Sequence, residues 1–180
     1  DKELEFTYYF DVLNLAESIY FPLLLAPIRE SDDDDTIKKK ISLVSAFLEI
    51  FVVFRGVNRR KYGHSTIRYR MYSLVKEIRN KTIKQLVHIF EKKYDELDEK
   101  LEGISDLMLH GQNKRFIKFL LARITRYIEE ECKIQSSFEG YMDAIQKKPF
   151  EIEHIWCNDY DLHKNEFDQR DNFQDYRNKV

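Results

Sequence analysis

The sequence predicts a mainly α-helical protein, a bundle of about five helices with one short β-strand or hairpin near the C-terminus. The 180-residue chain has only five glycines and three prolines, too few for a protein built of many strands and turns. Apolar residues recur at helical spacing over most of the sequence and alternate with polar residues only near the C-terminus. Hydrophobic residues make up 43% of the chain, so a sizeable core can form.

Four helices are expected in the N-terminal part. Residues 3–26 have apolar residues at helical spacing; Pro27 ends this segment, and Pro22 could divide it in two. Residues 36–55 form the most apolar predicted helix, which should lie at the centre of the bundle. The acidic run 31–35 is expected to cap this helix. The alternative is that the acidic run binds a cation. Ser65 or Thr66 is expected to cap a helix that ends at residue 80, and Thr82 one that ends at about residue 102.

The C-terminal part is predicted to contain one long helix and one strand. Residues 103–112 should form a connection and residues 113–133 a helix, followed by a polar segment with at most one helical turn. The apolar period then changes to two at residues 150–156, which predicts a strand, and residues 165–179 are very polar. We therefore divide the chain into regions 1–110 and 111–180.

Composition excludes several classes of protein. The two cysteines, Cys132 and Cys157, have no partner at metal-ligand spacing, which argues against a disulfide framework or a zinc site and favours a reducing, cytoplasmic location. The longest apolar stretches are too short or too interrupted to span a membrane. The net charge of −2 gives no information about partners. The first residue is Asp1 rather than Met, so we expect the chain to be a piece of a longer protein.

Positive charge is concentrated in residues 55–84, which hold ten basic residues and one acid, with three tyrosines among them. Such a stretch can neutralise nucleic-acid phosphates. The residues expected to contact DNA are Arg55, Arg59, Arg60, Lys61, Arg68 and Arg70. The other interpretation, which also stays open, is that these bases pair with the acids of residues 91–102 and of the tail.

The dipeptide Glu153-His154 has the chemistry of a phosphodiesterase site. Hydrolysis of a phosphodiester needs a base to activate water and a cation to stabilise charge. Histidine suits the first task and a carboxylate the second, as a ligand of a hard cation such as Mg²⁺. Successive side chains of a regular strand point to opposite faces, so both could act at one phosphate only where the strand ends or bends.

The sequence resembles the C-terminal region of GmrSD-type restriction endonucleases. The resemblance rests on FEIEHIW (150–156), preceded by RFIKFLLARITRYIEEE (115–131) and followed by NFQDYRNKV (172–180). In that family a strand of the form (Asp/Glu)-His-Ile-x-Pro opens an HNH, or His-Me finger, nuclease. The segments ESIYFPLLLAPI (17–28) and FLEIFVVFRGV (47–57) are similar to the helices that join this nuclease to an N-terminal nucleotide-dependent domain.

The resemblance implies that His154 is the general base and that Glu153 is a ligand of a divalent metal, Mg²⁺ or Mn²⁺. It also implies a DNA substrate, with modified phage DNA as one candidate, and an N-terminal nucleotide-dependent domain as partner in the same protein. The full-length protein would be a restriction or phage-defence hydrolase.

The sequence departs from the family pattern in two places. Cys157 stands where the pattern has proline. By this resemblance the Gly-Asn-Leu strand and the later helix with the remaining catalytic residues would follow Val180, so we expect a truncated His-Me finger that is inactive alone. Asn178 precedes the expected glycine and is assigned no role. The alternative function is a non-catalytic helical module that binds DNA or a protein through residues 55–84.

Overall fold

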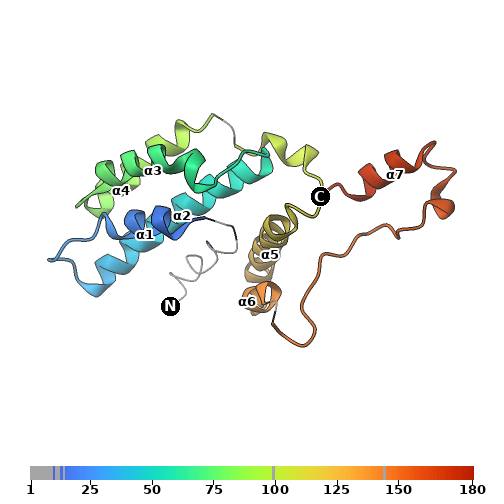
Figure 1. Ribbon diagram of the computed structural model, residues 1–180. Coiled ribbons are helices and arrows are strands. Elements are labelled where there is room, and N and C mark those ends of the chain that lie inside the picture. The colour runs from blue at the N-terminus through green and yellow to red at the C-terminus, as the bar shows by residue number, and fades with distance from the viewer. Residues whose placement is uncertain (1–9, 11–12, 14, 99, 144) are drawn as a thin grey trace. The chain divides into compact units, whose positions relative to one another are not determined.

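The computed structural model describes residues 10, 13, 15–98, 100–143 and 145–180. The chain divides into two compact units, Asp1–Gly103 and Ile104–Val180, a few residues before the predicted boundary at 110. The described residues are mainly helical, as the sequence predicts (Figure 1). The first part of the predicted helix 3–26 lies largely outside the described residues.

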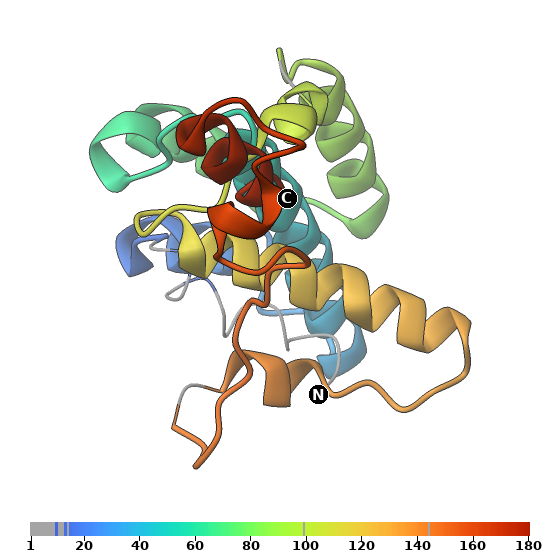
Figure 2. The same ribbon diagram turned by 90° about the vertical axis from the view of Figure 1, so that its right-hand side faces the viewer.

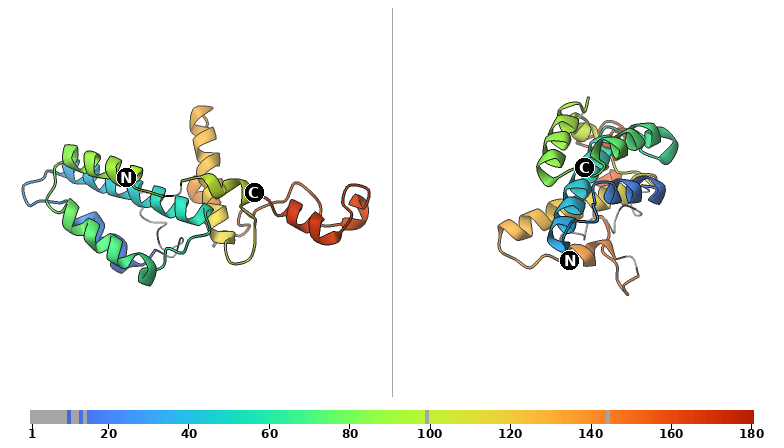
Figure 3. Two further views of the ribbon diagram at one scale, coloured as in Figure 1. Left: turned by 90° about the horizontal axis from the view of Figure 1, so that it is seen from above. Right: turned by 90° about the vertical axis from the view of Figure 1, so that its left-hand side faces the viewer.

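The first unit contains four helices: α1 (Glu17–Leu25), α2 (Asp34–Val57), α3 (His64–Ile78) and α4 (Ile83–Asp95). Figure 3 shows α3 alongside α1 and α4 alongside α2, and α1 also contacts α2. Leu48, Phe51 and Val52 of α2 are fully buried, because its apolar face lies at the centre of the unit as predicted. Pro22 lies inside α1 without dividing it.

Side-chain caps set two of these helix starts. Asp33 is the N-cap of α2, and its carboxylate accepts a hydrogen bond of 2.8 Å from the backbone N–H of Thr36. Thr82 is the N-cap of α4 and forms a capping box with Gln85. The predicted cap at Ser65 or Thr66 is wrong, because α3 starts two or three residues earlier, with Gly63 at the N-cap position.

α4, the last helix of this unit, ends earlier than predicted, because the side chain of Asn58 forms hydrogen bonds with the backbone that follows the helix. The Asn58 side chain donates to the carbonyl of Lys100 (2.8 Å) and accepts from the N–H of Gly103 (2.9 Å). Gly103 is required there, since a Cβ atom would lie 2.6 Å from Asn58 Oδ1 and from the carbonyl oxygen of Val57. The backbone continues as a short 3₁₀ helix, Glu102–Asp106.

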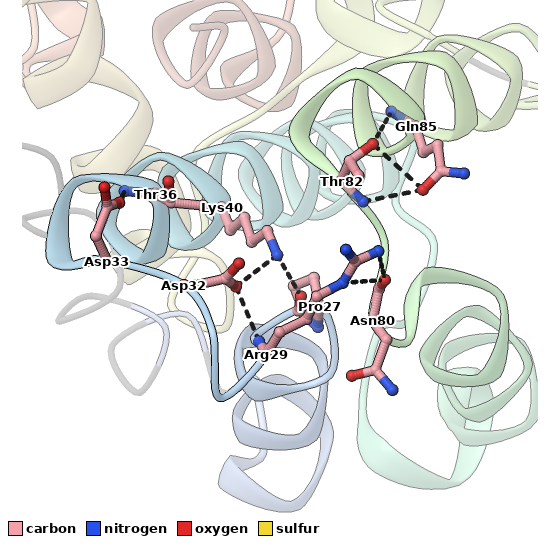
Figure 4. Close-up of polar contacts among 9 residues, drawn as sticks. All are labelled: Pro27, Arg29, Asp32, Asp33, Thr36, Lys40, Asn80, Thr82 and Gln85. Carbon is pink, nitrogen blue, oxygen red and sulfur yellow. Dashed lines mark hydrogen bonds and ion pairs between the residues drawn. The ribbon is translucent and has the colours of Figure 1, made fainter.

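A buried lysine joins the loop before α2 to the helix itself (Figure 4). Lys40 is 1% exposed; its Nζ donates to Asp32 Oδ2 at 2.6 Å and to the carbonyl of Pro27 at 2.8 Å. The hydrogen bond from Lys40 lowers the pKa of the Asp32 carboxyl below its ordinary value, and the N–H of Arg29 adds to this effect. The Arg29 guanidinium in turn donates to the carbonyl of Asn80, which ties this loop to the turn between α3 and α4.

The second unit contains α5 (Lys114–Glu131), α6 (Phe138–Met142), a 3₁₀ helix (Tyr160–His163) and α7 (Arg170–Arg177). α5 packs against α6 (Figure 2). Phe119 of α5 and Phe138 of α6 make an edge-to-face ring contact. An extended segment follows α6 and leads to the 3₁₀ helix, which contacts α7 (Figure 1). Phe173 of α7 is fully buried.

The predicted strand or hairpin at residues 150–156 is not formed. Among the described residues there is no β-strand, and the isolated β-bridge found there joins Met108 to Lys179. The alternation of apolar and polar residues instead reflects an extended backbone with one half-buried side. Ile152, His154 and Trp156 are half-buried, while Ile155 is fully exposed. A strand also needs a second segment to complete its hydrogen bonds, and the pattern of one segment does not specify that partner.

Candidate functional site

His154 is held by a residue at the end of α7. Its Nε2 lies 3.2 Å from Oδ1 of Asn178. The extended backbone on either side of residue 154 places Ile152 and Trp156 on the same, half-buried side as the imidazole. His154 is therefore part of the folded unit, with one ring nitrogen engaged in a defined contact.

Three further hydrogen bonds fix the position of Asn178 and its neighbour. Asn178 is the C-cap residue of α7, and its backbone N–H donates to the carbonyl of Gln174 at 3.0 Å. Its own carbonyl accepts from the N–H of Leu109 at 2.7 Å. The N–H of Val180 then donates to the carbonyl of Leu107 at 2.9 Å. The side chain that faces His154 thus belongs to a backbone that is hydrogen-bonded to α7 and to the segment 107–109.

This contact determines which imidazole nitrogen can act as a base. An amide oxygen accepts hydrogen bonds and donates none, so Nε2 of His154 carries the proton in the contact with Asn178 Oδ1. In the neutral ring Nδ1 then holds the lone pair. The arrangement can take a proton at Nδ1, and the resulting imidazolium keeps its hydrogen bond to Asn178.

Glu153 and His154 differ in exposure. Glu153 is exposed, whereas His154 is half-buried, the pattern that alternation along an extended backbone produces. The first bend after the pair is at Ile155 and Trp156. In the part of the chain that the structure describes, no group of three or more His, Cys, Asp or Glu side chains could hold a metal ion.

An aromatic cluster supports the segment that follows His154. Trp156 contacts His163, Phe167, Phe173 and Tyr176. The carbonyl of Trp156 accepts a hydrogen bond of 3.0 Å from Arg177 Nε, and Asn158 Oδ1 accepts one of 2.9 Å from Gln174 Nε2. This part of the chain is attached to α7 by ring contacts and hydrogen bonds, in the absence of strand pairing.

A second set of polar contacts lies beside this cluster, and no sequence pattern predicted it. Sγ of Cys157 lies 3.6 Å from Nε2 of His163, and Nδ1 of His163 lies 3.5 Å from Oε1 of Glu166. The three residues fall within ten positions of one another, but the turn that brings them together is irregular. The only signal in the sequence was their closeness along the chain.

Three of the six predicted DNA contacts meet at one pocket of the first unit. Arg55, Arg60 and Arg70 line a pocket of about 220 Å³, together with Phe51, Phe54, Leu97 and Asp98. The guanidinium carbons of Arg55 and Arg70 each lie 5.6 Å from the centre of the Phe51 ring. Nε and Nη2 of Arg55 also donate to the carbonyl of Lys61, at 2.9 and 2.6 Å.

The other three predicted contacts lie outside this pocket lining. Arg59 and Lys61 are exposed in the connection between α2 and α3. Arg68 is exposed on α3, about 200° around the helix from Arg70 at 100° per residue. Tyr69, between them, is 88% exposed. The basic segment therefore presents an arginine pocket, two exposed bases in the connection before α3, and Arg68 on another side of α3.

Comparison of the chain with models of protein families, with curated proteins and with solved structures finds no match. None of the described helices is long and apolar enough to cross a membrane.

Proposed function

We propose that this chain is part of a DNA endonuclease in which His154 is the general base for phosphodiester hydrolysis. The observation that carries the proposal is the contact between His154 Nε2 and Asn178 Oδ1. It supports the proposal because a general base must be held in one orientation, with its basic nitrogen unprotonated and directed to the water. Asn178 is itself fixed by its backbone hydrogen bonds, so it can serve as that support.

The chemistry assigns a separate task to each ring nitrogen. Nδ1 of His154 accepts a proton from a water molecule as the water oxygen attacks the phosphorus atom. The bond from phosphorus to the departing oxygen breaks, and that oxygen takes a proton from solvent. Nε2 stays hydrogen-bonded to Asn178 Oδ1 throughout, so the ring need not turn during the step.

The wider assignment is a modification-dependent restriction or phage-defence nuclease of the HNH, or His-Me finger, type. Its partners would be DNA, with modified phage DNA as one candidate, and an N-terminal nucleotide-dependent domain of the same protein. Mg²⁺ or Mn²⁺ would supply charge stabilisation at the phosphate, with Glu153 as one ligand. Among the described residues no group of three or more His, Cys, Asp or Glu side chains could hold the ion, so Glu153 is the one protein ligand proposed.

Nicking of supercoiled plasmid DNA by the full-length protein tests this proposal. With Mg²⁺ or Mn²⁺ present, His154→Ala should lower the cleavage rate about 10²- to 10⁴-fold, the usual contribution of a general base. His110→Ala is the matched control, because His110 is an exposed histidine of the same unit. Wild-type cleavage by His154→Ala would show that the assignment is wrong.

The arginine pocket supports a second candidate, a non-catalytic module that binds DNA. Guanidinium groups bind phosphate oxygens in a bidentate manner, and Arg55, Arg60 and Arg70 meet at one pocket. Tyr69, which precedes Arg70 in α3 and is 88% exposed, offers a ring for contact with a sugar or base. In this candidate residues 149–158 have a structural role only.

Salt-dependent binding of a short DNA duplex, measured by fluorescence anisotropy, tests the second candidate. If phosphates are contacted, affinity should fall steeply between about 50 and 200 mM salt. Replacing Arg60 and Arg70 by Ala should lower the slope of log K against log salt by about 2. Lys84→Ala is the control, because Lys84 is exposed at the start of α4 and lies outside the pocket lining. If the affinity for DNA did not change with salt concentration, the proposed DNA-binding role would be wrong.

A further inference from the structure

Cys157, His163 and Glu166 form a chain of polar contacts that the proposed nuclease chemistry does not use. Nε2 of His163 faces the sulfur of Cys157 at 3.6 Å, and Nδ1 of the same ring faces Glu166 at 3.5 Å. Each nitrogen thus has its own partner: the thiol on one side, a carboxylate on the other. This order of nucleophile, base and orienting group is the arrangement that activates a side-chain nucleophile.

The imidazole of His163 is held in this position by aromatic rings. It stacks on Phe173, with ring centres 5.2 Å apart and planes 20° apart, and contacts Trp156 at 4.5 Å. Only 19% of the side chain is exposed, while Cys157 is exposed to solvent. The base is therefore fixed, and a reagent can reach the sulfur.

The chain also contains its own reference thiol. Cys132 is exposed too, at the C-cap of α5, where its N–H donates to the carbonyl of Ile128. Among the contacts of the described residues, none joins its sulfur to an imidazole. Two exposed cysteines in one molecule thus differ in the group that lies beside the sulfur.

We propose that Cys157 is a nucleophilic thiol that undergoes thiol–disulfide exchange with small-molecule disulfides. Nε2 of His163 takes the thiol proton, and the Cys157 sulfur attacks one sulfur of the disulfide. The disulfide bond breaks as the new one forms, and the departing thiolate receives the proton from the imidazolium. The products are a mixed disulfide at Cys157 and one free small thiol, so the step needs no other oxidant. Glu166 is a positioning residue that holds the ring through Nδ1.

The rate of reaction with an aromatic disulfide that releases a coloured thiolate tests the proposal. Cys132→Ser leaves Cys157 as the only thiol, and Cys157→Ser leaves Cys132. Cys157 should react about tenfold faster or more in the folded protein, and the two rates should become similar in denaturant, where the contact with His163 is lost. Equal rates in the folded protein would overturn the proposal.

Two substitutions in the Cys132→Ser background identify the source of the reactivity. His163→Phe keeps a ring stacked between Trp156 and Phe173 but removes the base, so the rate should fall to that of Cys132. Glu166→Leu should lower the rate, and Glu166→Gln, which can still accept a hydrogen bond from Nδ1, should restore most of it. An unchanged rate in His163→Phe, with Trp156 fluorescence like that of the parent, would also overturn the proposal.

Discussion

The imidazole of His154 and the side-chain amide of Asn178 lie 3.2 Å apart, although 24 positions separate them in the chain. The intervening residues form the bend at Trp156, the 3₁₀ helix and α7. The contact thus depends on the fold of the whole C-terminal segment. It selects the tautomer of His154, because Oδ1 of Asn178 can only accept a hydrogen bond.

The tautomer of His154 should follow from this contact. We expect the neutral imidazole to carry its proton on Nε2, and Asn178→Ala to remove that preference, because the acceptor is lost. Long-range ¹H–¹⁵N NMR spectra of the histidine ring distinguish the two tautomers. His110, which is exposed, serves as the internal reference. A proton found mainly on Nδ1 in the wild-type protein would contradict the assignment.

The stability of the first unit should depend on pH through Asp32. Its pKa is lowered by the hydrogen bond from Lys40, so the folded state binds this proton less readily than the unfolded state. The stabilisation is therefore complete above the ordinary carboxyl pKa of about 3.9, and it is lost as pH falls through the lowered pKa. Asp32→Asn should remove this part of the acid dependence, measured as urea midpoints between about pH 2 and 6.

Asp35→Asn is the matched control for Asp32→Asn. Asp35 also pairs with a lysine, Lys39, at 2.6 Å, but the two side chains are 74% and 59% exposed. Exposed pairs contribute little, so the acid dependence should stay close to that of the wild type. The same change in both variants would mean that the buried contact with Lys40 has no special effect.

The capping box of α4 should contribute measurably to stability. The Thr82 side chain accepts from the N–H of Gln85, and the Gln85 side chain accepts from the N–H of Thr82. Thr82→Ala should lower the free energy of unfolding by about 1 kcal/mol, because a helix N–H loses its partner. Thr82→Ser, which keeps the hydroxyl, should lie close to the wild type in urea unfolding. A loss in Ser equal to that in Ala would rule out the cap as the cause.

Phe173 should be the most sensitive aromatic residue of the C-terminal segment. It is fully buried and contacts Trp156, Tyr160, His163 and Phe167. Phe173→Ala should cost about 3–5 kcal/mol, from lost burial and the cavity that remains. Phe150→Ala should cost much less, since Phe150 is 52% exposed. Urea unfolding followed by Trp156 fluorescence measures both, and equal losses would contradict this account of the cluster.

The helices of the first unit could be predicted because local signals determine them. The apolar face of residues 36–55, the acidic cap and Thr82 each act within a few residues of the structure that they specify. The end of α4 could not be predicted, because it depends on Asn58, a residue more than 40 positions from the backbone groups that it binds. From helical propensity alone, that helix is predicted to end at about residue 102.

The candidate site could be predicted only in part. Alternation identified an extended segment around His154, but the partner that completes a strand, and the side chain that contacts His154, come from distant positions. The sequence pairs Glu153 with His154 by adjacency alone, and in the structure Glu153 is exposed while His154 is half-buried. Cys157 was set aside because its spacing matched no known pattern; its neighbours are brought together by an irregular turn.

A double-mutant cycle on plasmid cleavage tests the central claim most directly. The rates to compare are those of the full-length protein, His154→Ala, Asn178→Ala and the double variant. If Asn178 acts by holding the base, Asn178→Ala should lower the rate about tenfold to a hundredfold in the wild-type background. It should have no further effect once His154 is absent. Equal losses from Asn178→Ala in both backgrounds, or full activity of His154→Ala, would contradict the account.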